Sequence, residues 1–134
     1  MAVTTTGNRA GSTHTLLGAL RVTSVLAVLS VAFQFVTAGQ LFPRGGPEEV
    51  HAGGAIVLHV VSALTTVAAF LYYRATRGPL WPTILSAVVL VAGFVQAYIG
   101  DEGVMSVHVP LAMLLTLGAV WVLVWAVGPA VRRR

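Results

Sequence analysis

The sequence contains no cysteine, and only 9% of its 134 residues are charged. The missing cysteine excludes disulfides, thiolate metal sites, thioether-linked cofactors and thiol chemistry. The scarcity of charge argues against a soluble domain, because 57% of the residues are hydrophobic and one small core cannot bury that much apolar surface. A bilayer solvates apolar side chains directly, so the composition predicts one membrane domain.

The sequence contains four long apolar runs. Each of these runs is long enough to cross a hydrocarbon core of about 30 Å, which takes about 20 helical residues. Leu, Ala and Val dominate and do not alternate with polar residues, which disfavours barrel strands. The sequence predicts an all-α, antiparallel four-helix membrane bundle in residues 16–134, after a disordered cytoplasmic tail in residues 1–15. The predicted spans are residues 22–42, 50–73, 80–100 and 104–127.

The charged residues predict the orientation of these spans. All eight basic residues are arginine, and seven of them lie before the first span, between the second and third, or after the fourth. The remaining one, Arg44, and all four acidic residues lie in the two opposite connections. Because cytoplasmic flanks of membrane helices collect basic residues, both termini are predicted to be cytoplasmic in a multi-pass plasma-membrane protein. Arginines that flank spans also argue against nucleic-acid binding. A signal-peptide interpretation of the first span is disfavoured by its length and by the polar segment before it.

Ionisable residues are scarce inside the spans. No Asp, Glu, Lys or Arg lies well inside one, which argues against a proton pump or an ion-coupled transporter. A polar group in hydrocarbon is costly and by default functional, so polar residues gathered at one depth predict a shared site. The alternative is that they only bond to one another across the bundle. These residues are Gln34, His51, His59, Gln96, Tyr98 and His108.

A weak internal repeat relates the two halves of the chain. Residues 54–60 resemble residues 103–109, and Gln34 with Ala38 resembles Gln96 with Gly100. The halves would then be helix-pair repeats, with the second and fourth helices parallel across a pseudo-twofold axis. Two imidazoles from opposite helices of such a bundle can provide both axial ligands of a haem iron.

The sequence does not decide which histidine would be the second ligand beside His108. The repeat alignment favours His59, whereas depth favours His51, which lies 23 residues before Arg74 while His108 lies 24 residues before Arg132. His59 would lie about 12 Å deeper than His51 at a rise of about 1.5 Å per residue. We rank His108 first, His51 second and His59 third as ligands.

At these residues the chain resembles one half of the haem A synthase family, whose members are duplicated four-helix units with histidine ligands on the second and fourth helix of each unit. Glu48-Glu49-Val50-His51 is similar to the family's E-x-x-H, Gln96 with Gly100 to its Q-x-x-x-G, and Val107-His108 with Ala112 to its L-H-x-x-x-A. The chain also resembles small actinobacterial four-helix membrane proteins of unassigned function. No arginine follows His51, the loop cysteines are missing and only one half is present, so the oxidative conversion of haem is not carried over.

Together these observations predict an iron-containing b-type haem protein of the membrane, ligated by His51 and His108, acting in electron transfer or haem handling. Gln34, Gln96 and His59 are predicted to orient the ligands or bond to the cofactor. Arg44 is a candidate partner for a propionate, although a solvated loop cation is the simpler interpretation. No catalytic residue is predicted. The resemblance to a duplicated family implies a homodimer.

Two other functions are open. One is a cofactor-free subunit that packs in a larger membrane complex through Gly53 and Gly54, or through Gly93 and Ala97. The other is a membrane protein that binds a quinone or another small molecule in the same pocket.

Overall fold

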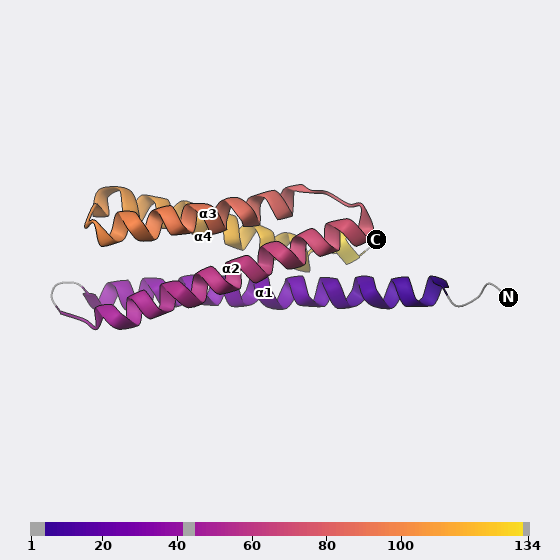
Figure 1. Ribbon diagram of the computed structural model, residues 1–134, viewed down its shortest axis with the longest axis horizontal. Helices are drawn as coiled ribbons and strands as arrows, with labels where there is room; N and C mark the ends of the chain where they lie inside the picture. The colour runs from indigo at the N-terminus through magenta and orange to yellow at the C-terminus, as the bar shows by residue number, and fades with distance from the viewer. Residues whose placement is uncertain (1–4, 42–44, 133–134) are drawn as a thin grey trace.

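Four long helices make up nearly all of the computed structural model, which describes residues 5–41 and 45–132. They are α1 (Thr5–Leu41), α2 (Glu48–Thr76), α3 (Trp81–Asp101) and α4 (Met105–Val127), and the short α5 (Pro129–Arg132) follows. The long helices lie side by side and alternate in direction (Figure 1). Each is long and apolar enough to cross a membrane. The predicted all-α, four-helix bundle is confirmed.

Helix boundaries agree with the predicted spans except at the start. The bounds of α2, α3 and α4 fall within three residues of the prediction. The first helix, however, begins at Thr5, so residues 5–15 are helical where the sequence predicts a disordered tail. No proline interrupts residues 5–41, and a helix nucleated in the apolar run can continue outward because propagation costs far less than nucleation. Residues 1–4 of that predicted tail lie outside the described residues.

The bundle has two unlike ends. We call the end with the start of α1, the α2–α3 connection and α5 the terminal end, and the end with the α1–α2 and α3–α4 connections the hairpin end. Both ends of the chain lie at the terminal end (Figure 1). Arg74 and Arg77 lie there too, at and just after the last turn of α2, whereas Glu48 and Asp101 lie at the hairpin end.

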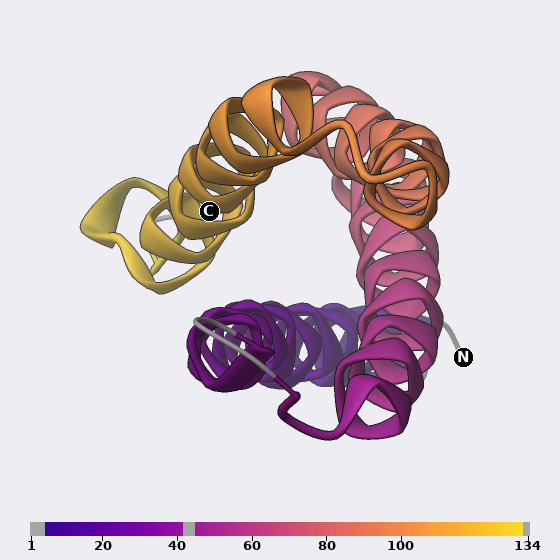
Figure 2. The ribbon, with the colours of Figure 1, turned by 90° about the vertical axis from the view of Figure 1, so that its left-hand side faces the viewer.

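Each long helix packs against the next in the chain, and α1 also contacts α4, which closes the ring. Among the described residues, the backbones of the diagonal pairs, α1 with α3 and α2 with α4, do not come close to each other, although side chains of α2 and α4 meet, as the rings of Tyr72 and Trp125 do with centres 6.1 Å apart. Both α2 and α4 run from the hairpin end to the terminal end, so they are parallel and occupy opposite corners (Figure 2). The predicted parallel arrangement of the second and fourth helices is therefore present.

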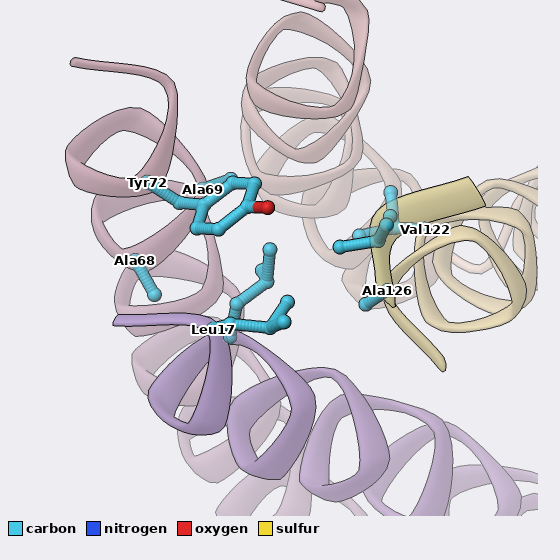
Figure 3. Close-up of a cluster of buried hydrophobic side chains, with 8 residues drawn as sticks. Leu17, Ala68, Ala69, Tyr72, Val122 and Ala126 are labelled. Atoms are coloured by element: carbon cyan, nitrogen blue, oxygen red, sulfur yellow. The ribbon is translucent and has the colours of Figure 1, made fainter. Parts of the chain in front are cut away.

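The tightest packing lies near the terminal end. Leu20 of α1 and Ala126 of α4 are completely buried. They belong to one cluster with Leu17 of α1 and with Ala69 and Tyr72 of α2, and Figure 3 shows Leu17, Ala69, Tyr72 and Ala126 together. Alanines let the helix backbones approach closely, as in other membrane bundles. Arg21 links α1 to α4 in the same region, because its Nε donates a hydrogen bond of 3.0 Å to the carbonyl of Ala126. The terminal half is thus closed, while most large apolar side chains of α3 and α4 face outward, where lipid would cover them.

Candidate functional site

A cavity of about 810 Å³, its open mouth included, lies among all four long helices on the hairpin side of this core. The enclosed space inside it that a water-sized molecule can reach is about 150 Å³, smaller than the 300–1,000 Å³ or so of typical small-molecule sites, so a larger ligand would also occupy the open mouth or displace side chains. The lining is apolar except for Ser62 and five of the polar residues that the sequence predicts to share a site, namely Gln34, His51, His59, Gln96 and His108. Tyr98 is not among the lining residues and is 64% exposed. Arg44 lies outside the described residues.

His51 and His108 occupy equivalent positions. Each is the fourth residue of its helix, α2 or α4, counted from the hairpin end. Both imidazoles line the same cavity. The structural correspondence between the two halves therefore matches His51 with His108, at the level that the depth count predicts. His59 lies eight residues further along α2, about 12 Å deeper at a rise of about 1.5 Å per residue.

The His51 ring is held by α1. Its Nδ1 lies 2.9 Å from the hydroxyl of Thr37, and that hydroxyl donates its own proton to the carbonyls of Phe33 and Gln34, each at 3.1 Å. With the single Thr37 proton directed to these carbonyls, the hydroxyl oxygen accepts from Nδ1–H of His51, and Nε2 keeps its lone pair. Gln34 adds a second tie, because its Nε2 donates to the backbone carbonyl of His51 at 3.2 Å.

The His108 ring is held by α3 in a similar way. Its Nδ1–H donates to the carbonyl of Gln96 at 2.9 Å, which again leaves the lone pair on Nε2. That lone pair accepts a hydrogen bond of 3.1 Å from the side-chain amide of Gln96. The ring lies on Gly100, where an added Cβ would be only 2.6 Å from Cε1 and Nδ1 of His108. Gln96 and Gly100 are one helical turn apart on α3, so the Q-x-x-x-G spacing places both residues against this imidazole.

His59 differs from the other two. Its Nδ1–H donates to the carbonyl of Ala55 on its own helix at 2.6 Å, and its ring stacks on Phe94 with ring centres 4.1 Å apart. Its Nε2 is buried and has no hydrogen-bond partner within the part of the chain that the structure describes. Gly93 lies beside this atom, because a Cβ added there would be 3.4 Å from it.

In all three imidazoles Nδ1 is thus the donor and Nε2 carries the lone pair, which in His108 accepts from the Gln96 amide. Metal-binding histidines commonly have this arrangement, in which a hydrogen bond from one ring nitrogen fixes the orientation and tautomer of the other. In residues 5–41 and 45–132 there is no group of three or more His, Asp or Glu side chains that could hold a metal ion. A bare metal ion with three protein ligands is therefore not supported, which leaves chemistry that needs only two imidazoles or a hydrogen-bond acceptor.

Several residues of the site were not found by sequence reasoning. Thr37 holds His51 and follows Gln34 by three residues, so that helical spacing was the available signal. Phe94 and Gly93, which contact His59, gave no signal because apolar and small residues occur throughout these helices.

Comparison of the chain with protein-family models, with curated proteins and with solved structures found no match.

Proposed function

We propose that this protein is a membrane haem protein in which Nε2 of His51 and Nε2 of His108 are the axial ligands of a b-type haem. The observation that supports it best is the equivalence of these two residues. They lie at the same turn of two parallel, diagonally opposed helices, both line one cavity, and both have Nδ1–H tied to the preceding helix. Two imidazoles are sufficient for a six-coordinate haem iron, whose other four ligands come from the macrocycle.

The space between the helices suits a flat apolar group. Ala38, Ala55, Gly93 and Ala112 line the cavity from α1, α2, α3 and α4, so no large side chain fills its centre from these positions. Among the residues that the structure describes, no Asp, Glu, Lys or Arg lines it either. A macrocycle bound here would exchange contacts with lipid or water for contacts with Leu, Val and Phe side chains.

Gln96 sets the main condition on this proposal. Its amide now occupies the lone pair of His108 Nε2, so the side chain of Gln96 must turn away before that nitrogen can bind iron. The backbone carbonyl of Gln96 stays in place and keeps His108 in the same tautomer. Thr37 does the same for His51. Bound haem supplies reversible one-electron transfer, and the protein supplies two oriented imidazoles and an apolar surround that sets the reduction potential.

Spectroscopy of the protein expressed with ample haem tests the proposal. We expect a Soret band and a low-spin, six-coordinate spectrum in the wild type. His51→Ala and His108→Ala should each give a five-coordinate spectrum or an empty protein, because each loses one axial nitrogen. His59→Ala should keep the six-coordinate spectrum, because His59 lies about two turns deeper.

His14→Ala is the matched control, since His14 is exposed on α1 and lies outside the cavity. A wild type without a Soret band would remove haem ligation and leave the membrane-subunit interpretation in its place. Loss of the low-spin spectrum in His59→Ala, together with its retention in His51→Ala, would show that the repeat alignment identified the correct pair.

The topology that accompanies this proposal has both termini and the α2–α3 connection in the cytoplasm of a cell-membrane protein, because Arg74 and Arg77 lie at the terminal end and the acidic residues at the other. The haem would then lie near the outer face. The proposed assembly is a homodimer, which would restore the number of helices in a duplicated protein. Gly54 is buried against Phe33 and Gln34, and Gly93 lies against His59, so these two glycines serve contacts within the bundle.

A further inference from the structure

The deep part of the cavity contains a polar atom that the axial pair does not use. Nε2 of His59 carries a lone pair, because the ring's proton is on Nδ1 and is donated to Ala55. The atom is buried, and the described residues provide no donor for it. Burying an acceptor without a donor is unfavourable, so a molecule that brings an O–H or N–H to this point is favoured there.

The walls of the cavity limit the class of that molecule. Within residues 5–41 and 45–132 no carboxylate lines the cavity to neutralise a cation, and a fully ionised carboxylate or phosphate has no proton to donate to Nε2. The ligand must therefore be neutral. The lining of the cavity that contains His59 includes Leu58, Val89, Leu90 and Leu115, so most of the ligand must be apolar. A phenolic O–H meets both conditions and donates more strongly than an aliphatic one because it is more acidic.

The surroundings of the ring leave one direction open. Phe94 covers a face of the imidazole, and Phe94 itself is 59% exposed, so it separates His59 from the outside of the bundle. Gly93 leaves space beside Nε2, which any larger residue would reduce, since even a methyl group would lie 3.4 Å from that nitrogen. The histidine is thus fixed in orientation, shielded on the lipid side and open next to its acceptor atom.

We infer that His59 is the hydrogen-bond acceptor of a binding site for a neutral, lipid-soluble hydroquinone, whose phenolic O–H donates to Nε2. This site is about 12 Å deeper along α2 than His51. It rests on His59 and Gly93 and does not require the axial pair, although both sites share one cavity.

Two matched probes test the inference on the full-length protein in lipid nanodiscs, without haem and under nitrogen. The first is trimethylhydroquinone, and the second is its dimethyl ether, which has a similar shape but no O–H. Comparing them cancels most of their partition into lipid. We expect the hydroquinone to bind at least about tenfold more tightly than the ether, a difference of about 1.4 kcal/mol. We also expect the hydroquinone alone to shift the ¹⁵N resonance of His59 Nε2.

Three variants complete the test. His59→Phe keeps a flat ring but removes the acceptor, so the two probes should bind equally. Gly93→Ala should weaken the hydroquinone by filling the space beside Nε2. Gly53→Ala is its control, because a Cβ at position 53 meets nothing within 4 Å and binding should not change.

The outcomes separate this inference from the haem proposal. Equal binding of the two probes to the wild type, or no binding of either, would overturn it, and so would discrimination that survives in His59→Phe. A normal Soret band with no discrimination refutes only the His59 site. Discrimination in a protein that never acquires a Soret band refutes only the haem proposal.

Discussion

Replacing Gly100 with alanine tests directly how His108 is held. The added Cβ would lie 2.6 Å from Cε1 and Nδ1 of the imidazole, whereas ordinary contacts begin at 3.4 Å. The ring must therefore retreat by about 0.8 Å, unless α3 itself moves. A retreat directed away from α3 would stretch the 2.9 Å bond between His108 Nδ1 and the Gln96 carbonyl to as much as about 3.7 Å, beyond a hydrogen bond.

The expected cost follows from these distances. Overpacking typically costs about 1–3 kcal/mol, and the lost hydrogen bond adds about 0.5–1.5 kcal/mol. Alanine returns about 0.5–1 kcal/mol through its better helix propensity. We therefore expect Gly100→Ala to lower the free energy of unfolding by about 0.5–4 kcal/mol. Gly53→Ala should instead be neutral or slightly stabilising, because its Cβ meets open space.

Unfolding in mixed micelles measures both variants, and ¹⁵N spectra of the histidines report whether His108 keeps its proton on Nδ1. The Gly100→Ala protein should show a mixture of His108 tautomers and, with haem supplied, less of the low-spin form. If the Gly100→Ala protein is as stable as Gly53→Ala and His108 is still protonated on Nδ1, Gln96 and Gly100 do not position the His108 ring, and the reasoning is refuted.

Three further predictions concern the bundle as a whole. Arg77 ends α2 in the left-handed conformation with φ of 53°, so Arg77→Gly should raise the free energy of unfolding by about 0.5–1 kcal/mol in the same assay, and a loss of stability would mean that its side chain matters more than its backbone. A cysteine at Ala75 should be labelled by a membrane-impermeant maleimide only after the membrane is opened, and labelling of intact cells would reverse the proposed topology. Crosslinking in native membranes should yield a dimer, and monomer alone at every protein concentration would exclude the twofold assembly.

Sequence alone determined the class of the protein and most of its elements. The number and bounds of α2, α3 and α4 followed from the length of the apolar runs, because the thickness of a bilayer fixes how many helical residues are needed to cross it. The same logic selected the polar residues of the cavity, since polar side chains are rare enough in hydrocarbon that each one is conspicuous. It was wrong about residues 5–15, where a continuing helix extends beyond the apolar run that nucleates it.

Tertiary structure decided how those residues are arranged. The sequence left open whether His51 or His59 matches His108, because counting residues to an arginine measures depth only as well as the ends of the helices are known. The rotation of each helix sets the contacts of these rings: α1 brings Thr37 to His51, whereas α3 places Gln96 and Gly100 against His108. The rotation of a helix about its own axis depends on packing, here through Leu20 and Ala126 near the terminal end, and no single span encodes that packing.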